Sequence, residues 1–167
     1  IYFFRNIGTV DEPLYAPAER WGPGRKDLVA ADFNGDGAID LVASGGYFSD
    51  VRRNRLAAWT PVELKRGYHV GRDDLWHPVD WDRDGLPDLA MLDHEGYLAF
   101  FEREKHDGKL LLKAPRRAFV DEKGAPLRLN AGTAGKSGRR KLCVTDWDGD
   151  GRFDLLLNSS NADFLQQ

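Results

Sequence analysis

Short apolar stretches alternate with polar ones along this chain, and clusters of aspartate and glycine separate them at recurring places. The stretches come in pairs, one on each side of an acidic cluster: residues 26–33 with 41–44, 77–81 with 89–92, and 141–147 with 155–157. Apolar runs of this length, bounded by turn residues, are typical of β-strands. Since no segment combines a helical period with capping residues, the sequence predicts an all-β protein.

Two further strands are expected after the second pair. The turn-forming residues 93–96 lead into an alternating stretch at 97–101, and a second turn at residues 107–108 precedes the apolar run 110–113. Together with the pair before them, these stretches predict a unit of four antiparallel strands.

The acidic clusters belong to an internal repeat. Residues 31–41, 79–89 and 145–155 align without gaps, and their first aspartates lie 48 and 66 residues apart. Blades of a β-propeller repeat at about 40 to 50 residues, and the longer interval leaves room for an insertion. The repeat therefore predicts β-propeller blades of four antiparallel strands.

The two ends of the chain resemble different parts of one blade. Residues 2–6 are similar to the third strand at 99–103, and the last unit stops after its second strand. About two complete blades and two partial ones are then expected, whereas a closed wheel takes at least about four. We expect residues 1–167 to form one region of a larger propeller of about seven blades, with the remaining blades supplied by the parent chain or another chain.

Each acidic loop has nine positions, of which the first, third, fifth and ninth carry a side-chain oxygen. Calcium takes six to eight oxygen ligands, and alternate side chains of a tight loop can converge on one ion. The residue at position 7 would add its backbone carbonyl, and the glycine at position 6 permits the turn. The expected ligands of three structural Ca²⁺ sites are Asp32, Asn34, Asp36, Ala38 and Asp40; Asp80, Asp82, Asp84, Leu86 and Asp88; and Asp146, Asp148, Asp150, Arg152 and Asp154.

Two other interpretations fit the opening spacing of these loops. An EF-hand needs flanking helices and a glutamate at position 12, where this chain has Ala43, Met91 and Leu157. The loops could also be solvated turns without an ion, but three or four like charges within one loop repel each other unless a cation neutralises them. Calcium sites are therefore the favoured interpretation.

The loops change the interpretation of the overall charge. The chain has 24 basic and 27 acidic residues and a net charge of −3. Eleven of the acids lie in the three loops, so the remainder has 16 acids and carries a charge of +8. Its basic clusters are short and scattered, which argues against a nucleic-acid partner. No apolar run approaches the roughly 18 residues of a membrane span.

The one cysteine, Cys143, cannot form a disulfide within the chain. It lies between Leu142 and Val144 in an expected strand, where a small apolar side chain would be buried. We therefore predict a buried, inert thiol.

The three loops, the strand at residues 2–4 and the segment 5–9 behind it resemble the FG-GAP or VCBS repeats of integrin α-subunit propellers and of many secreted bacterial proteins. The resemblance implies blades around a central channel and calcium as a structural staple. The chain departs from the family at Asn34, which lowers the charge of the first loop, and in the unmatched stretches 45–76 and 102–141. Calcium sites of this kind fit calcium-rich compartments, so we expect a secreted, periplasmic or cell-surface protein.

A ligand is expected on the face opposite the loops, where other connections between strands would lie. The residues expected on that face are Tyr47, residues 66–77, the turn at His94 and Glu95, residues 136–140, and Asn161. Tyr68, Arg72, Trp76 and His77 come close together in sequence there. Such a mixture of aromatic, basic and titratable groups suits an anionic polysaccharide or another glycan.

Some propellers similar to this one are polysaccharide lyases that act on uronic-acid polymers. β-Elimination needs a base that removes the proton next to a carboxylate and a group that stabilises the enolate. His77 or His94 would serve as base and neutraliser, with Tyr68 and Arg72 nearby. In the simpler interpretation, His77 begins a strand, His94 lies in an exposed turn, and the protein is a non-catalytic module that binds glycan or protein.

Overall fold

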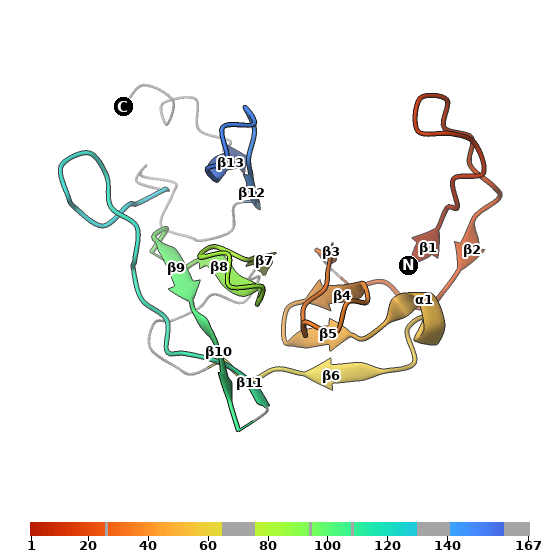
Figure 1. The fold of residues 1–167 in the computed structure, drawn as a ribbon, viewed down its shortest axis with the longest axis horizontal. Helices are drawn as coiled ribbons and strands as arrows, with labels where there is room; N and C mark the ends of the chain where they lie inside the picture. The colour runs from red at the N-terminus through yellow and green to blue at the C-terminus, as the bar shows by residue number, and fades with distance from the viewer. Residues whose placement is uncertain (26, 65–75, 94, 108, 130–140, 159–167) are drawn as a thin grey trace.

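The computed structural model describes residues 1–167 except 26, 65–75, 94, 108, 130–140 and 159–167 (Figure 1). The described residues form short strands and one helical turn, α1 (Val51–Asn54), which confirms the prediction of an all-β protein. No helix in this part of the chain is long and apolar enough to cross a membrane. The strands are β1 (Tyr2–Phe3), β2 (Glu19–Arg20), β3 (Val29–Ala31), β4 (Asp40–Ala43), β5 (Gly46–Phe48), β6 (Trp59–Pro61), β7 (His77–Val79), β8 (Asp88–Leu92), β9 (Leu98–Phe101), β10 (Arg103–His106), β11 (Lys109–Leu112), β12 (Lys141–Thr145) and β13 (Asp154–Asn158).

The strands form five small antiparallel sheets. The largest has the order β3-β4-β5-β6 and the next has the order β7-β8-β9, while β1 pairs with β2, β10 with β11, and β12 with β13. The sheet β3 to β6 has four strands. The unit at residues 77–113, for which four strands are predicted, instead has a sheet of three, β7 to β9, because its last stretch pairs with β10 in a separate hairpin. The assembly of such sheets into propeller blades stays a prediction.

The strands that precede the three acidic clusters, β3, β7 and β12, lie toward the middle of the molecule. β7 is the neighbour of β3 on one side and of β12 on the other, whereas β6 and β11 lie farther out (Figure 1). The sheets follow one another in an arc, with the β1–β2 hairpin at one end and the β12–β13 hairpin at the other.

β8 is buried along its whole length, and its side chains face two separate cores. Leu89 and Met91 pack with a cluster that includes Val42 of the preceding sheet, while Ala90 and Leu92 pack with a cluster that includes Leu142 of β12. The division follows from strand geometry, since successive side chains point to opposite faces of a sheet. The middle sheet therefore joins the two halves of the arc.

Three expectations about single side chains are wrong. Trp76 is buried in the first core, so it cannot stack on a glycan at the surface. Cys143 is exposed, because its neighbour Leu142 points into the second core and Cys143 points to the other face of β12. Tyr47 was expected on the face opposite the loops, but its ring packs edge-on against Phe33 of the first acidic loop, with the centroids 5.2 Å apart.

Candidate metal centre

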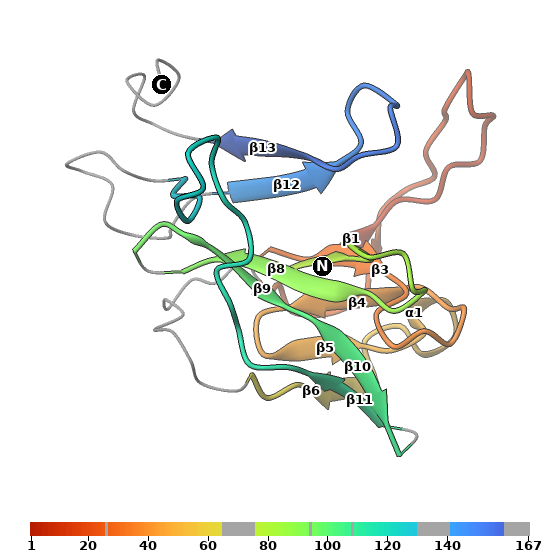
Figure 2. The ribbon, with the colours of Figure 1, turned by 60° about the vertical axis from the view of Figure 1, so that its left-hand side comes forward.

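Each acidic loop connects the first two strands of a sheet. Residues 32–40 (loop 1) join β3 to β4, residues 80–88 (loop 2) join β7 to β8, and residues 146–154 (loop 3) join β12 to β13. The three loops lie at the same end of the molecule (Figure 2). They are also in contact, because Leu86 of loop 2 lies beside Gly35 of loop 1 and the guanidinium of Arg83 donates to the carbonyl of Gly151 in loop 3.

Four hydrogen bonds recur in all three loops. The N–H of position 6 donates to the position 1 carboxylate at 2.8 to 3.0 Å, and the N–H of position 5 donates to the position 3 side chain at 3.0 to 3.2 Å. The N–H of position 7 donates to position 5 at 2.8 Å, and the N–H of position 2 donates to position 9 at 2.9 to 3.1 Å. The acidic side chains therefore fold the backbone of each loop.

The glycine at position 6 adopts the left-handed backbone in each loop. The φ angles of Gly37, Gly85 and Gly151 are 85°, 87° and 86°. A residue with a Cβ atom is strained in this conformation, so glycine is required there, as the sequence predicts.

Position 9 ties loops 1 and 2 to the chain that follows the third strand of the same unit. Asp40 and Asp88 are 0% and 1% exposed. Besides the position 2 amide, Asp40 accepts the N–H of Asp50 at 2.9 Å and Asp88 accepts the N–H of Arg103 at 2.7 Å. Burial raises the pKa of both carboxyl groups, and these backbone donors oppose the rise. In each unit the buried aspartate thus fixes the chain that follows the third strand.

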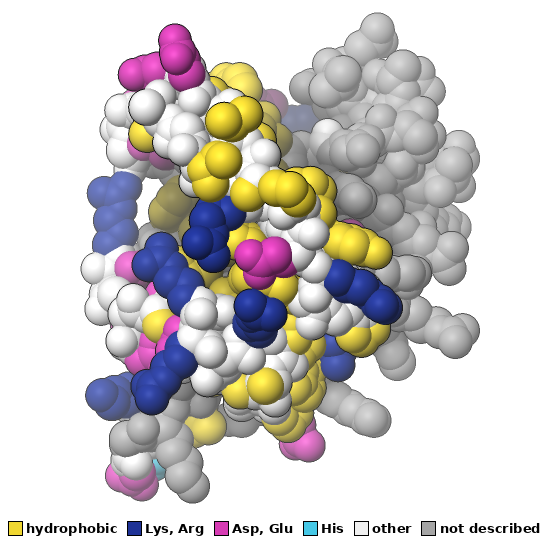
Figure 3. Space-filling model, turned by 90° about the vertical axis from the view of Figure 1, so that its right-hand side faces the viewer, with side chains coloured by type: hydrophobic (Ala, Val, Ile, Leu, Met, Phe, Trp, Pro, Cys, Tyr) yellow, Lys and Arg dark blue, Asp and Glu magenta, His cyan; other side chains and the backbone are white. Residues whose placement is uncertain are grey.

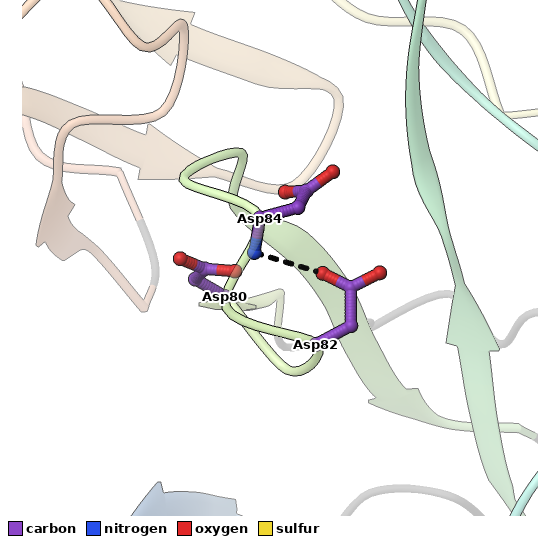
Figure 4. A group of neighbouring side chains, drawn as sticks. All are labelled: Asp80, Asp82 and Asp84. Atoms are coloured by element: carbon purple, nitrogen blue, oxygen red, sulfur yellow. Dashed lines mark hydrogen bonds between the residues drawn. The ribbon is translucent and has the colours of Figure 1, made fainter.

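Loop 2 gathers three carboxylates at the surface (Figure 4). Each of Asp80, Asp82 and Asp84 places an oxygen within 4.8 Å of the other two. The Oδ2 atom of Asp80 accepts the N–H of Gly85 at 3.0 Å, whereas its Oδ1 atom is buried and has no hydrogen-bond partner among the described residues. A buried carboxylate oxygen without a donor, beside two further carboxylates, fits a cation.

Loop 3 gathers a different set of carboxylates. Oxygens of Asp146, Asp148 and Asp154 lie within 4.8 Å of one another. Asp150 instead forms an ion pair with the Nε atom of Arg152 at 2.8 Å. The apolar side chain of position 2 is also exposed here, since Trp147 is 72% exposed while Phe33 of loop 1 is fully buried.

Loop 1 has an amide at position 3. The Nδ2 atom of Asn34 donates to the carboxylate of Asp36 at 2.9 Å, and its Oδ1 atom accepts the N–H of Asp36 at 3.0 Å. Asn34 thereby removes one negative charge from the loop and gives Asp36 a hydrogen-bond donor. Loop 1 consequently carries less repulsion between carboxylates than loop 2 does.

The available donors indicate the kind of metal. All side-chain ligands are carboxylate or amide oxygens, which suit Ca²⁺ or Mg²⁺ and not a thiophilic metal. The preference for Ca²⁺ over Mg²⁺ stays a prediction, which rests on the strict octahedral geometry that Mg²⁺ demands and on the water it retains. Coordination by the position 9 carboxylates and by the carbonyls of Ala38, Leu86 and Arg152 stays a prediction.

Of the four catalytic candidates, only His77 lies within the described residues; Tyr68, Arg72 and His94 lie outside them. His77 begins β7, where it pairs with Ala90. Its Nε2 atom is buried without a hydrogen-bond partner, and burial lowers the pKa of its imidazole from 6.5 to about 4. His77 is therefore neutral at pH 7 and a weak base.

Sequence reasoning did not single out Arg103. This side chain is 6% exposed and lies over the ring of Phe33, with Cζ 4.1 Å from the ring centre. The only sequence signal is a charged residue two positions after the apolar stretch of β9. That signal is weak, because an arginine at the end of a strand is usually solvated.

Comparison of the chain with protein-family models, with curated proteins and with solved structures gives no match in any of the three.

Proposed function

We propose that this chain is part of a calcium-stabilised β-propeller, in which each acidic loop binds Ca²⁺ and fixes the first two strands of a blade. Loop 2 carries the proposal. Its three carboxylates lie within 4.8 Å of one another, and the buried Oδ1 atom of Asp80 has no hydrogen-bond partner among the described residues. An unsatisfied buried acceptor costs about 1 to 3 kcal/mol, which a bound cation would relieve while it neutralises the neighbouring charges.

The arrangement of the sheets supports the propeller. β3, β7 and β12 lie inside the arc and the later strands lie outside it (Figure 1). Corresponding residues also face the same way from unit to unit, since Leu89 and Leu155 both pack against the preceding sheet. Blades around a central axis require this consistent direction.

A groove beside the β1–β2 hairpin also fits a propeller. It has a volume of about 550 Å³, and its lining includes Ile39 and Leu41 of the first acidic unit and Trp21 beside β2. Apolar and basic side chains lie close together on this face of the molecule (Figure 3). In a propeller, Leu41 would face the inner strands of the preceding blade, as Leu89 faces β3 to β6. The parent chain or another chain would supply those strands.

We propose binding of an anionic glycan, without catalysis, as the task of the assembled propeller. The surplus of basic residues outside the loops favours an anionic partner, and a protein partner is the alternative. A lyase needs a base whose pKa lies near the working pH, and burial, which lowers the pKa of His77 to about 4, argues against His77 in that role. The calcium sites favour a secreted, periplasmic or cell-surface location, where calcium is plentiful.

Thermal unfolding tests the calcium sites. A ligand that binds only the folded state stabilises it by about 2.7 kcal/mol at a hundred times its Kd. The unfolding temperature should therefore rise when EDTA is replaced by millimolar CaCl₂, and MgCl₂ should raise it much less. Equal unfolding temperatures in EDTA and in calcium would contradict the proposal.

The lyase alternative has its own assay. Uronate polymers are incubated with the protein, and the absorbance of unsaturated products is followed. The binding proposal predicts that no such product forms, while the same polymers are retained on the protein. Product formation that disappears in His77→Ala would instead favour the lyase.

A further inference from the structure

A second cavity lies where the β10–β11 hairpin meets the sheet β3 to β6. Both ribbon views show β10 and β11 beside β5 and β6 (Figures 1 and 2). The cavity has a volume of about 290 Å³. Its apolar walls include Val62 and Leu112, and its polar groups include Tyr47, Thr60, Glu63 and Arg103.

Arg103 is buried at this cavity without a full set of partners. Its Nε atom donates to the carbonyl of Pro87 at 3.0 Å, and the flat guanidinium lies over Phe33. Its Nη2 atom is buried and has no hydrogen-bond partner among the described residues. Arg103 takes part in none of the ion pairs among the described residues.

The positive charge of Arg103 is only partly compensated. Asp88 lies nearby, but its carboxylate already accepts the backbone N–H groups of Trp81 and Arg103. Burial lowers the pKa of Arg103 even though Asp88 and Tyr47 act to raise it. Burying a cation is costly unless an anion and hydrogen bonds surround it, and its field is strong where water is excluded. An anion in the cavity beside Arg103 would be attracted by the positive charge of its guanidinium.

We propose that the cavity binds a small organic molecule with one carboxylate group, which Arg103 attracts and the apolar walls enclose. The volume is near the lower limit for small-molecule sites, so the ligand is about as large as one sugar or one aromatic ring.

Glu63 limits the charge of the ligand. Its exposed carboxylate lines the same cavity, so a second negative charge on the ligand would be repelled. The hydroxyl groups of Tyr47 and Thr60 can donate hydrogen bonds to the carboxylate or to a sugar body. A singly charged acid therefore fits the lining better than a phosphate dianion. The cavity borders loop 1, since Asn34 also lines it.

Titration calorimetry on the full chain tests the proposal with sodium benzoate and sodium glucuronate as probes. Benzamide and glucose are the uncharged controls, and inorganic phosphate is the dianion. We expect saturable binding of at least one carboxylate with a Kd in the millimolar range, and no binding of its uncharged control. Arg103→Met should weaken this binding at least about tenfold, because it removes the only buried cation of the cavity.

Glu63→Gln provides a second variant that should not disturb folding, since Glu63 is exposed. It should tighten binding of the carboxylate about threefold, because it removes a like charge from the rim. The matched control is Glu122→Gln, an exposed residue outside the cavity, which should change nothing.

Three results would overturn the proposal. The first is no saturable binding of either carboxylate up to about 20 mM. The second is equal binding of the uncharged controls or tighter binding of phosphate. The third is an affinity that Glu63→Gln leaves unchanged, and this result decides the question even if Arg103→Met does not fold.

Discussion

Loops 1 and 2 share a backbone but differ at position 3. Both have the same four backbone hydrogen bonds, the same left-handed glycine and the same buried aspartate at position 9. In loop 1 the amide of Asn34 donates to Asp36, and the Oδ1 atom of Asp32 accepts the N–H of Asp36 at 3.1 Å. In loop 2 the carboxylate of Asp82 lies near two others, and the buried Oδ1 atom of Asp80 has no hydrogen-bond partner among the described residues. The comparison separates two roles of the acidic residues. Backbone folding is common to both loops, whereas the side chain at position 3 sets how many carboxylates each loop carries.

The largest expected effect concerns the role that the two loops share. Asp88→Ala leaves the buried N–H groups of Trp81 and Arg103 without an acceptor. Asp40→Ala does the same to the amides of Phe33 and Asp50. Each unsatisfied group costs about 1 to 3 kcal/mol, so each variant should lose about 3 kcal/mol of unfolding free energy in EDTA, measured by urea denaturation.

Asp154→Ala is the matched control for these two variants. Asp154 is only partly buried, and among the described residues it accepts only the N–H of Trp147. Its loss should be about 1 kcal/mol. Equal losses at Asp88 and Asp154 would show that burial at position 9 does not matter.

The next effect concerns the cation itself. Asp82→Asn removes a charge from loop 2 and supplies the kind of amide that loop 1 has. Ligand charge sets much of the calcium affinity of such loops, so the affinity of this site should fall about thirtyfold. Calcium titration by calorimetry measures the change, and an unchanged affinity would mean that the three carboxylates do not hold the ion.

The reverse exchange should have a smaller effect. Asn34→Asp gives loop 1 the acidic pattern of loop 2, and its calcium affinity should rise about tenfold. In EDTA the same variant should be less stable by about 0.5 to 1 kcal/mol, because a third carboxylate adds repulsion that is partly screened by solvent. A variant that is more stable in EDTA than the original chain would contradict the difference between the loops.

The smallest expected effect is a pH dependence of stability that comes from His77, a residue outside the acidic loops. His77 has a folded-state pKa of about 4 and an ordinary value of 6.5, so between these values the unfolded chain binds a proton that the folded chain does not. The free energy of unfolding should therefore have its full value above about pH 6.5 and fall by about 1 kcal/mol as the pH drops toward 4. This figure allows for the partial solvent exposure of His77. His77→Gln should remove this loss in EDTA, as followed by urea denaturation at each pH.

The acidic loops could be predicted from sequence because they are local. Their ligating positions, the glycine at position 6 and the flanking strands lie within eleven consecutive residues. Period-two alternation and turn residues likewise predict the all-β fold. Alternation does not say which face of a strand is covered, however. Cys143 could be placed only once Leu142 was known to face the second core.

Contacts between distant residues could not be predicted. Arg103 lies over Phe33, Arg83 reaches Gly151, and Trp76 lies in the core beside Val42. Each of these contacts depends on how the sheets pack against one another, which no local pattern records. The same holds for the cavity beside Arg103, since its lining comes from two sheets.

We propose that loop 2 binds calcium more tightly than loop 1 does, because loop 2 has one more carboxylate. Crystals of the full chain grown in limiting and then in millimolar calcium, with anomalous scattering used to locate the ions, test it most directly. We predict a peak among Asp80, Asp82 and Asp84 at limiting calcium, and a peak at loop 1 only at the higher concentration. Empty loops in millimolar calcium, or loop 1 filled before loop 2, would contradict the account.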